Sequence, residues 1–426
     1  MGLAHKLKTA RDVLSRYGVS EVFQLLVRNV TRVGRRVICR SGSQLGRLRR
    51  RVFPPMRHGR LRILYVGSRF EIENGETARY RIDNLRQALT DRCDTRFEIA
   101  ENGIDRDRAL LRWADIIVLM RTRWSEPVAH ILDKAKATRI PVVFDVDDLL
   151  FSVKYADLFC RVLNDMSTET LRTFRSEFSD FARVFACTAF STASTEFIAE
   201  RMRQEGKEAF VIPNGFNRTQ QRIAQRALKR PRPAGVRYIV YMSGTRTHDR
   251  DLQQAIPALT RVVQEYPDVR FRLIGYADET LLPPALAAKT DTVPFMSWKK
   301  LIRFAAENTI NIAPLEVANP FCHAKSELKY FEAAIAGVPT VASPTDTFRR
   351  CIDSGVNGLL ADGEEEWYTA FHTLLDDPAR YAAIRGEAMR RAQAEYSPRA
   401  VAEKALAAYR TILRCASAKD SASAEK

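Results

Sequence analysis

Short apolar runs alternate with amphipathic stretches along the chain from Leu61 onward. The first run, residues 62–66, ends at Gly67, and residues 79–89 then repeat apolar positions at helical spacing. Further runs typical of buried strands cover residues 114–119, 141–145, 184–187 and 209–212. Because strands that alternate with helices pair side by side in parallel, this half predicts a parallel sheet with crossover helices.

The same alternation begins again after a turn at residues 212–215 and a polar, basic stretch that ends in Pro-Arg-Pro-Ala-Gly. Strand-like runs then cover residues 238–242, 269–274, 292–295, 309–313 and 338–342, with a helical pattern at 252–265. The pattern predicts an α/β protein of two tandem Rossmann-like domains that face each other across a cleft. The expected divisions are an extension at 1–60, domains at 61–215 and 237–398 joined by a linker at 216–236, a helix at 399–416 and a disordered tail at 417–426.

The first sixty residues have a pattern of their own. Residues 3–37 place apolar side chains at helical intervals with Arg and Lys between them, and an arginine-rich run at 47–51 precedes Pro54 and Pro55. A basic amphipathic helix of this kind can lie on an anionic membrane surface. A helix packed on the first domain, or a basic arm without structure, explains the pattern as well, and RNA binding is the remaining alternative.

The net charge of +17 belongs mostly to this extension. Residues 1–60 carry 15 of the 68 Lys and Arg side chains but only two of the 51 acids, Asp12 and Glu21, so the rest of the chain has a net charge of only +4. A nucleic-acid-binding protein would need this charge on its folded domains. We therefore expect no nucleic-acid partner.

The composition favours a cytoplasmic protein, which could also be a peripheral protein on the inner face of the cell membrane. The sequence has neither a membrane-spanning apolar run nor a secretory leader pattern. Its seven cysteines are scattered without a Cys-x-x-Cys pair, which is typical of reduced thiols, and its six histidines offer no metal-ligand spacing. We expect no bound metal.

Candidate binding residues follow the strands of the second half, where open α/β sheets bind ligands. Residues 243–251 combine Gly244 with hydroxyls and cations at a helix start, which suits a phosphate group, although a capped helix explains them equally. In the segment 320–332, Lys325, Lys329 and Glu332 share one helical face. Two cations and a carboxylate there could bind a diphosphate and sugar hydroxyls, and a surface salt-bridge stripe is the alternative.

The segment 326–343, Ser-Glu-Leu-Lys-Tyr-Phe-Glu-Ala-Ala-Ile-Ala-Gly-Val-Pro-Thr-Val-Ala-Ser, resembles the donor-binding segment of GT-B-fold glycosyltransferases, particularly the retaining group known as family four. Residues 352–360 and 292–297 are similar to other parts of that donor site. The resemblance implies that Glu332 binds the nucleotide ribose and that Lys325 meets the diphosphate of a nucleoside diphosphate sugar. The implied donor-binding residues are Gly244, Thr245, Arg250, Phe295, Lys325, Ser326, Lys329 and Glu332.

Two positions depart from the family pattern. The first glutamate of the family's pair would fall at Ala324, and the arginine that usually follows the glycine is Thr245. Contacts to the donor sugar must therefore differ, with Glu327, His323 or Asn319 as substitutes. The wording of these motifs resembles a subgroup of bacterial surface-polysaccharide transferases.

A third candidate cluster lies in the first half, where Asp145, Asp147 and Asp148 follow a strand. Such carboxylates could orient acceptor hydroxyls, act as a base or bind Mg²⁺. The alternative is that Asp147 or Asp148 caps a helix, and a phosphotransfer pocket is less favoured. The cations Arg79, Arg81, Arg121 and Arg123 fall nearby in the pattern.

Together these observations predict a glycosyltransferase that moves a hexose or deoxyhexose from a nucleoside diphosphate sugar to a lipid-linked or oligosaccharide acceptor in surface polysaccharide biosynthesis. The candidate catalytic residues are Lys325, Glu327, Asp147 and Asp148. No cofactor beyond the donor substrate is expected. A sugar-nucleotide epimerase and a non-catalytic nucleotide-binding or scaffold subunit are the alternatives.

Overall fold

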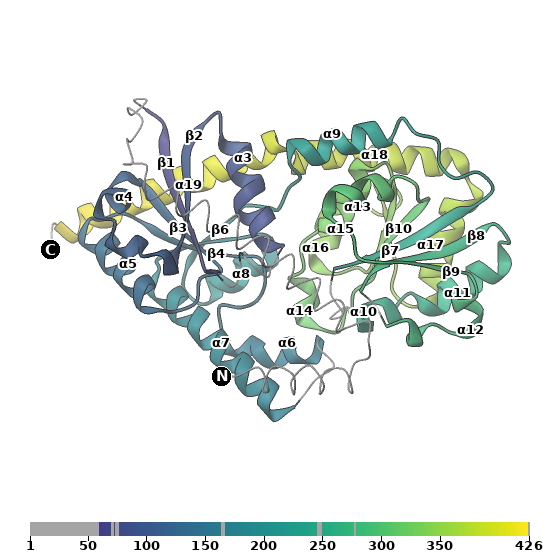
Figure 1. The fold of residues 1–426 in the computed structure, drawn as a ribbon, viewed down its shortest axis with the longest axis horizontal. Coiled ribbons are helices and arrows are strands. Elements are labelled where there is room, and N and C mark those ends of the chain that lie inside the picture. The colour runs from purple at the N-terminus through teal and green to yellow at the C-terminus, as the bar shows by residue number, and fades with distance from the viewer. Residues whose placement is uncertain are drawn as a thin grey trace, which may run out of the picture. The chain divides into compact units, whose positions relative to one another are not determined.

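Two parallel sheets of six strands each organise the chain (Figure 1). The computed structural model describes residues 59–424 except 70–71, 73–75, 163–166, 245–248 and 277. The amphipathic helix expected at residues 3–37 lies outside these residues. Each strand pairs with its neighbours in parallel. The predicted fold class of two Rossmann-like α/β sheets is therefore confirmed.

The first sheet has the strand order β2-β1-β3-β4-β5-β6. Its strands are β1 (Leu61–Gly67), β2 (Cys93–Ile99), β3 (Ile116–Met120), β4 (Val142–Val146), β5 (Phe190–Ala193) and β6 (Glu208–Val211). Every residue of β3 is buried, because helices cover both faces of the sheet. This burial is why its sequence reads as a continuous apolar run.

The helices of the first half connect these strands. They are the π-helical turn η1 (Arg79–Asn84), α3 (Leu85–Leu89), α4 (Arg108–Trp113), α5 (Glu126–Ala137), α6 (Ala156–Val162), α7 (Thr168–Cys187) and α8 (Glu196–Gln204), with short turns η2 (Ala100–Asn102), η3 (Ile104–Arg106) and η4 (Val153–Tyr155). The helix expected at residues 79–89 is thus present, but its first part is a π-helix. This form is rare in proteins and, where it occurs, is often found at functional sites.

The strand expected at residues 184–187 is wrong, because these residues end helix α7. The buried side chains of α7 are Phe178, Phe181, Val184 and Phe185, which share one helical face, so the apolar run belongs to a helix pattern. The strand at this place in the sheet is β5, whose hydroxyl side chains Ser191 and Thr192 hide it from a search for apolar runs. The edge strand β2 was also not expected, since it is only half-buried.

The second sheet has the order β12-β11-β10-β7-β8-β9. Its strands are β7 (Arg237–Ser243), β8 (Val269–Gly275), β9 (Thr290–Val293), β10 (Ile310–Ala313), β11 (Thr340–Ala342) and β12 (Leu359–Leu360). The other elements are α10 (Asp249–Gln253), α11 (Ile256–Glu265), η6 (Glu279–Leu281), α12 (Pro284–Ala287), α13 (Trp298–Ala305), α14 (Pro320–His323), α15 (Leu328–Ile335), α16 (Asp346–Cys351), α17 (Glu364–Asp376) and α18 (Pro378–Tyr396). All five strand-like runs of this half are strands, with small shifts at their ends.

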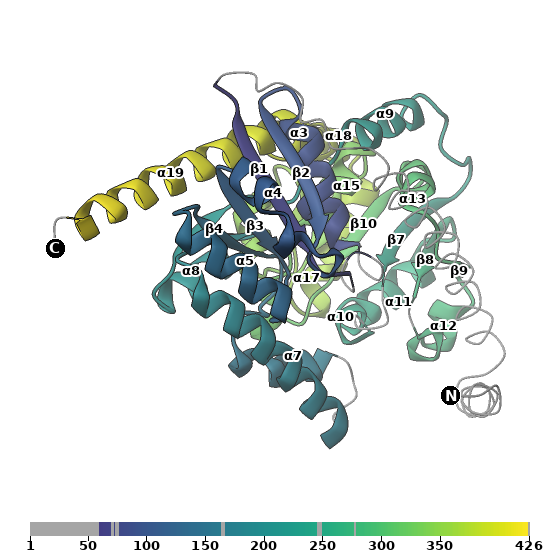
Figure 2. The same ribbon diagram turned by 60° about the vertical axis from the view of Figure 1, so that its left-hand side comes forward.

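Two helices connect the halves of the chain. Helix α9 (Arg218–Ala227) occupies much of the stretch expected as a linker and begins with a capping box between Asn217 and Gln220. Helix α19 (Pro398–Ala424) returns to the first sheet, where Figures 1 and 2 show it beside α3. Its buried residues, including Tyr409 and Ile412, share a core with β1 and α3. The helix continues to Ala424, through most of the segment expected as a disordered tail.

Each sheet reverses its strand order beside its first strand, between β1 and β3 and between β7 and β10. Ligands of open α/β sheets bind at such reversals, beyond the carboxyl ends of the strands. Residues that follow β3, β4, β7 and β10 are therefore the ones to inspect for a site. No helix in the described part of the chain is both long and apolar enough to cross a membrane.

Replacing Arg81 by Met should lower the free energy of unfolding by about 3–5 kcal/mol, because it leaves the buried carboxylate of Asp145 without its cation. Arg175→Met is the matched control, since Arg175 forms an ion pair with Asp157 that is about half exposed, and should change stability by less than about 1 kcal/mol. Urea unfolding followed by circular dichroism measures both. Equal midpoints for the two variants would contradict the structural role of Arg81.

Candidate active site

The first aspartate after the carboxyl end of the first sheet has a structural role. Asp145 accepts hydrogen bonds from Arg81 Nε at 3.0 Å, Arg81 Nη2 at 2.5 Å and the Thr192 hydroxyl at 2.7 Å. Arg81 and Asp145 are both almost fully buried. Since both carboxylate oxygens are engaged, Asp145 supports the ends of β4 and β5 and does not face a ligand.

The same arginine extends this network to the second half of the chain. Its Nη1 atom donates to the Ile212 carbonyl at 2.5 Å and to Asn214 Oδ1 at 3.1 Å. The amide nitrogen of Asn214 then donates to the Ser326 hydroxyl at 3.1 Å. This chain of polar groups thus fixes the turn after β6 relative to Ser326, two residues before the start of α15.

Asp147 and Asp148 lie in a bend after β4, and neither caps a helix, because Ser152 occupies the N-cap position of the next helical turn. Arg121 Nη1 lies 3.1 Å from Asp147 Oδ1 and 3.3 Å from Asp148 Oδ2. Arg121 follows β3 and has φ of +41°, a strained conformation for a residue with a side chain. Burial raises the pKa of Asp147, although the charge of Arg121 opposes this shift.

Lys325 meets the same acidic cluster from the second half. Its ammonium group lies 3.1 Å from Asp148 Oδ1 and 4.8 Å from the centre of the Phe321 ring. Burial disfavours the charged form, but the carboxylate of Asp148 outweighs it and raises the pKa of Lys325. A cation that is held charged, between the ends of the two sheets, can stabilise negative charge on a ligand.

Glu332 projects from α15 toward the π-helical turn of the first half. Its carboxylate accepts hydrogen bonds from the Tyr80 hydroxyl and from Gln220 Nε2 at 2.9 Å. Arg79 Nη1 lies 3.7 Å from the same oxygen. One carboxylate oxygen therefore has several donors around it, from η1 and α9, and two of these residues, Tyr80 and Gln220, were not among the sequence candidates.

Lys329 lies one turn before Glu332 and beneath the end of β7. Its ammonium group donates to the Met242 carbonyl at 2.5 Å and lies 4.9 Å from the centre of the Tyr241 ring. Burial lowers the pKa of Lys329 to about 8. The expectation that Lys325, Lys329 and Glu332 share one helical face is wrong, because Lys325 precedes the start of α15 at Leu328. The alternative of a salt-bridge stripe is also wrong, since Lys325 and Lys329 bond to Asp148 and to the Met242 carbonyl.

The carboxyl ends of β7, β8 and β9 hold the remaining donor candidates. Gly244 has open space around its α-carbon, and Arg250 is exposed on α10. Phe295 is 49% exposed and stacks on Tyr276, with ring centres 5.1 Å apart. Gly275 has φ of +95° and brings its backbone so close to Ser243 that a Cβ would lie 2.0 Å from the Ser243 carbonyl oxygen. Thr245 lies outside the described residues.

Glu327 is separated from the other candidates. It is the residue before α15, is 8% exposed, and one of its carboxylate oxygens is buried without a hydrogen-bond partner. Burial raises the pKa of its carboxyl, with the Tyr396 hydroxyl and Lys404 opposing. Its surroundings are thus α18 and α19, and its catalytic role remains a prediction that this placement does not favour.

The other proposed substitutes for the missing glutamate have structural partners. His323 accepts from the Asp346 N–H at Nδ1, so its Nε2 donates to the Val317 carbonyl at 2.9 Å, and the ring stacks on Phe197. Asn319 caps α14 by accepting from the Phe321 N–H. Ala324 itself is fully buried in the core of the first half.

The structure thus brings Lys325, Asp147 and Asp148 together, and Ser326 and Lys329 follow Lys325 in the sequence. Partners that lie far away in the sequence, such as Tyr80 and Asn214, could not be named from local patterns. Tyr80 lies in the π-helical turn between Arg79 and Arg81, two cations already noted. Among the described residues, no group of three or more His, Cys, Asp or Glu side chains could hold a metal ion.

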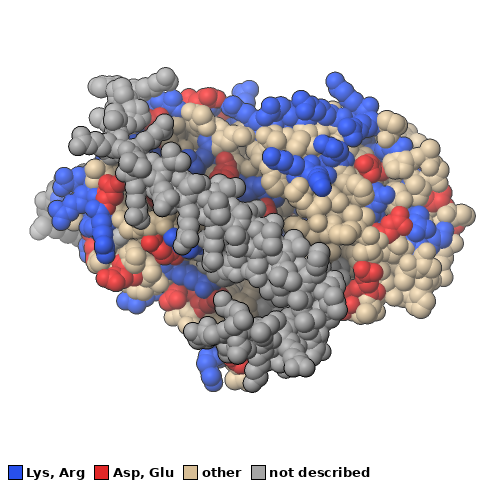
Figure 3. Space-filling model, in the orientation of Figure 1, with Lys and Arg blue, Asp and Glu red and all other residues tan. Residues whose placement is uncertain are grey.

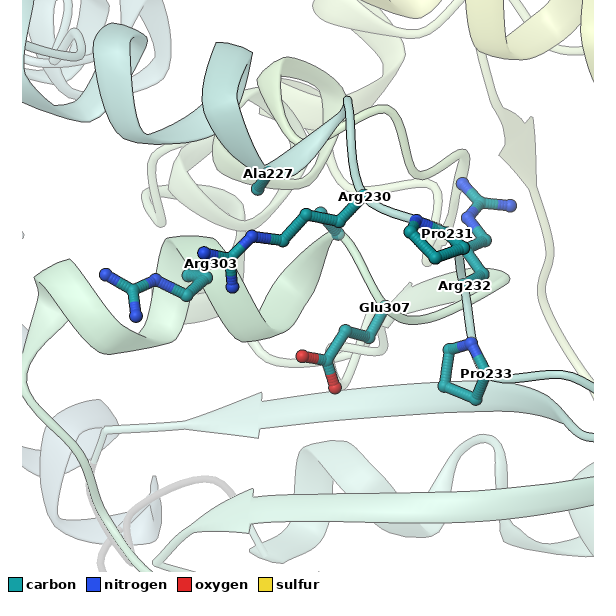
Figure 4. A pocket seen from close by; sticks show the side chains of 8 residues that line it. Ala227, Arg230, Pro231, Arg232, Pro233, Arg303 and Glu307 are labelled. Carbon is teal, nitrogen blue, oxygen red and sulfur yellow. The ribbon is translucent and has the colours of Figure 1, made fainter.

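A separate hollow of about 320 Å³ lies between the residues that follow α9 and the end of α13 (Figure 4). It is lined by Ala227, Arg230, Pro231, Arg232, Pro233, Arg303, Ala306 and Glu307. None of these residues belongs to the cluster around Asp148 and Lys325. The hollow is therefore not the candidate active site.

Comparisons with known proteins find a matching family model in the second half of the chain. Residues 236–377 match the family model described as "Glycosyl transferases group 1". A D-inositol 3-phosphate glycosyltransferase of Rhodococcus opacus is 36% identical over 96 residues, which are 22% of this chain and 21% of the relative. A phosphatidyl-myo-inositol mannosyltransferase of Mycobacterium leprae is 26% identical over 227 residues, 50% of this chain and 57% of the relative. The chain spans between about a fifth and somewhat more than half of the length of these relatives.

Solved structures share the fold over most of the chain. Anabaena HepE in complex with UDP has a TM-score of 0.56 at 13% identity, covering 82% of this chain and 100% of that chain. Sucrose-phosphate synthase of Thermosynechococcus elongatus has a TM-score of 0.53 at 14% identity, covering 84% of this chain and 100% of that chain. The two sheets of this chain therefore have the GT-B arrangement.

The pKa of Lys329 predicts a pH effect on stability. Burial lowers the pKa of Lys329 from its usual value of 10.5 to about 8 in the folded state, so the unfolded chain binds more protons between these two pH values. Lys329 therefore makes stability rise with pH in this range by at most about 1.4 kcal/mol per pH unit. Lys329→Met removes this contribution. Thermal unfolding at pH 8 and pH 9 measures it as the difference between the two proteins.

Lys136→Met, at an exposed lysine of α5, is the matched control and should follow the unmodified chain. If Lys329→Met also follows the unmodified chain across this pH range, Lys329 is not held in a desolvated position.

Proposed function

We propose that this chain, whose residues 236–377 form a group 1 glycosyltransferase domain within a GT-B fold, transfers a hexosyl group from a nucleoside diphosphate sugar to an acceptor hydroxyl. The contact between Lys325 and Asp148 carries the proposal. It places a charged ammonium group from the donor-binding half against a carboxylate pair from the first half. A leaving diphosphate and an incoming hydroxyl need these two kinds of group side by side.

The donor nucleotide is assigned to residues at the carboxyl ends of the second sheet. The carboxylate of Glu332 takes the ribose hydroxyls, and the exposed Phe295 stacked on Tyr276 faces the base. The phosphates approach the open backbone at Gly244, with Thr245, Arg250, Ser326 and Lys329 around them. The complexes of Anabaena HepE with UDP and with UDP-glucose support a uridine nucleotide as the first to test.

Ribose binding by Glu332 requires a rearrangement, because Tyr80 and Gln220 already donate to its carboxylate. A carboxylate oxygen accepts more than one hydrogen bond, so the ribose can share Glu332 with Gln220 while it replaces Tyr80. Arg79, whose Nη1 is buried without a hydrogen-bond partner, then lies beside the nucleotide.

The transfer breaks the bond between the anomeric carbon and the diphosphate oxygen, and the electron pair of this bond stays on the diphosphate. Lys325 stabilises that charge as it forms. The acceptor oxygen bonds to the anomeric carbon, and its proton passes to the leaving phosphate when configuration is retained. Asp147 and Asp148 orient the acceptor hydroxyl, since their carboxylates are fixed by Arg121 beside Lys325.

The acceptor is proposed to be lipid-linked or an oligosaccharide, in the biosynthesis of a surface polysaccharide on the inner face of the cell membrane. The name of the Mycobacterium leprae relative supports a lipid acceptor. Residues 1–60 would hold the enzyme at an anionic membrane surface by their basic charge.

Two alternatives predict different outcomes. A non-catalytic nucleotide-binding or scaffold subunit is consistent with the buried Ala324 at the family's first glutamate position. An epimerase needs a free base near the anomeric carbon, and both ring nitrogens of His323 already have backbone partners. His248, the other histidine near the candidate donor residues in the sequence, lies outside the described residues.

A nucleoside diphosphate should raise the thermal unfolding temperature of the chain. At a ligand concentration of 100 times Kd it adds about 2.7 kcal/mol to the free energy of unfolding. Lys325→Ala and Glu332→Ala should each abolish the shift while keeping the unliganded transition. The screen uses UDP, GDP and dTDP and their sugars. Lys136→Ala and Glu365→Ala, at exposed positions, serve as controls that keep the shift. Site variants that respond like these controls would refute the donor site.

Asp148→Asn should lower acceptor-dependent transfer about 100-fold, because an amide oxygen accepts a hydrogen bond from the acceptor hydroxyl more weakly than a carboxylate does and carries no charge to balance Lys325. Its nucleotide-induced thermal shift should persist. Transfer from a panel of radiolabelled nucleotide sugars, with and without acceptor, measures the effect. Asp157→Asn, in an exposed ion pair with Arg175, is the control.

This assay also separates the alternatives. A scaffold subunit gives no product with any donor, and an epimerase converts the donor without an acceptor. Full transfer activity in Asp148→Asn would remove the carboxylate pair from the reaction.

A further inference from the structure

A cluster of cations lies on one face of the second half, outside the candidate active site. Helices α9 and α13 and the segment just after α9 present seven exposed cationic side chains: Arg222, Arg226, Lys229, Arg230, Lys299, Lys300 and Arg303. We call this surface the α9–α13 cationic face. Figure 3 shows Lys and Arg side chains gathered over the positions of α9 and α13 in Figure 1.

The packing of the two helices explains why these cations point outward together. Ala224 of α9 shares a core with Ile302 of α13, and Ala227 shares another with Ala305. Since these small and apolar side chains fill the contact, the long charged side chains of both helices are left to solvent. The result is a continuous charged surface built from two adjacent helices.

This surface has almost no compensating negative charge. Neither α9 nor α13 contains an Asp or Glu residue. Within the described part of the chain, none of the seven cations lies in an ion pair, whereas exposed arginines elsewhere do, for example Arg261 with Glu364 and Glu365. The charge of this face is therefore available for an external anion.

The hollow beside Arg230 lies at one end of this face (Figure 4). Arg230 reaches along its upper side toward α13, and the prolines after α9 close its opposite end. Its one carboxylate, Glu307, lies 3.9 Å from the buried guanidinium of Arg272, which offsets its charge. The hollow can therefore admit a small anionic group such as a phosphate.

We propose that the α9–α13 cationic face docks on the surface of an anionic lipid bilayer. This proposal rests on the charge of the two helices and goes beyond the proposed transfer reaction and the expected role of residues 1–60. A bilayer attracts unpaired Lys and Arg side chains through its lipid phosphates and needs no shape-matched partner. The hollow beside Arg230 would take one headgroup phosphate.

Two other partners fit the face less well. A protein partner would need an apolar centre to its interface, and the large hydrophobic side chains exposed on the described residues are Val153, Phe295 and Val356, none on these helices. A single-stranded nucleic acid would need aromatic side chains for stacking, and Trp298 of α13 is half-buried beside the guanidinium of Arg79.

The test compares two variants of the full chain that lose the same charge. Arg222→Gln, Arg226→Gln and Arg303→Gln are combined in the face variant. Arg108→Gln, Arg112→Gln and Lys136→Gln, at exposed positions of α4 and α5, are combined in the control variant. Residues 1–60 are present in both. Binding is measured by co-sedimentation with vesicles of phosphatidylcholine containing about one third phosphatidylglycerol, at fixed salt.

We expect the face variant to lose at least tenfold in vesicle binding, while the control variant stays within about threefold of the unmodified chain, with equal thermal unfolding temperatures for all three. Equal losses in both variants would overturn the proposal, because the effect would then be one of net charge. No loss in the face variant, or no binding of the unmodified chain to these vesicles, would also overturn it. So would a loss confined to single-stranded DNA binding in a parallel assay.

Discussion

The ion pair between Lys325 and Asp148 is the contact on which the account of this molecule depends. The two residues are 177 positions apart in the sequence and come from segments beyond the ends of different sheets. Burial alone would favour a neutral lysine, and the aspartate is what holds it charged. The GT-B arrangement matters here because it brings the reversal points of two sheets to one place, where the charged pair forms.

Other polar contacts hold these ends in register. Arg81 ties β4 to the turn after β6, and Asn214 continues the network to Ser326 beside Lys325. Glu332 accepts from Tyr80 and Gln220 on the other side of α15. Together these contacts leave few polar groups of the site without partners. A donor nucleotide must therefore replace some of the existing hydrogen bonds with its own.

Much of the fold could be predicted from the sequence because buried parallel strands are continuous apolar runs between helices. The misses have physical reasons. Strand β5 carries the buried hydroxyls of Ser191 and Thr192, and the Thr192 hydroxyl donates a hydrogen bond to Asp145. Helix α9 is so rich in Arg and Gln that its sequence resembles a linker. The apolar end of α7 resembled a strand because four residues are too few to distinguish the two periods.

The site was predictable only in part. The family resemblance indicated Lys329 of α15 and Lys325 just before it. The three aspartates of residues 145–148 were selected because they follow a predicted strand. The different roles of these aspartates could not be predicted, since only the structure pairs Asp145 with Arg81 and Asp148 with Lys325. Glu327 was selected by its neighbours in sequence, yet its carboxyl lies under the influence of Tyr396 and Lys404, because a residue at the start of a helix can face the core.

The most direct test of the central claim is a crystal structure of the full chain with a bound uridine diphosphate. The account predicts that the ammonium group of Lys325 lies within about 3.2 Å of a diphosphate oxygen, with Asp148 still beside it. A diphosphate bound away from Lys325, with this lysine still paired only to Asp148, would contradict the account.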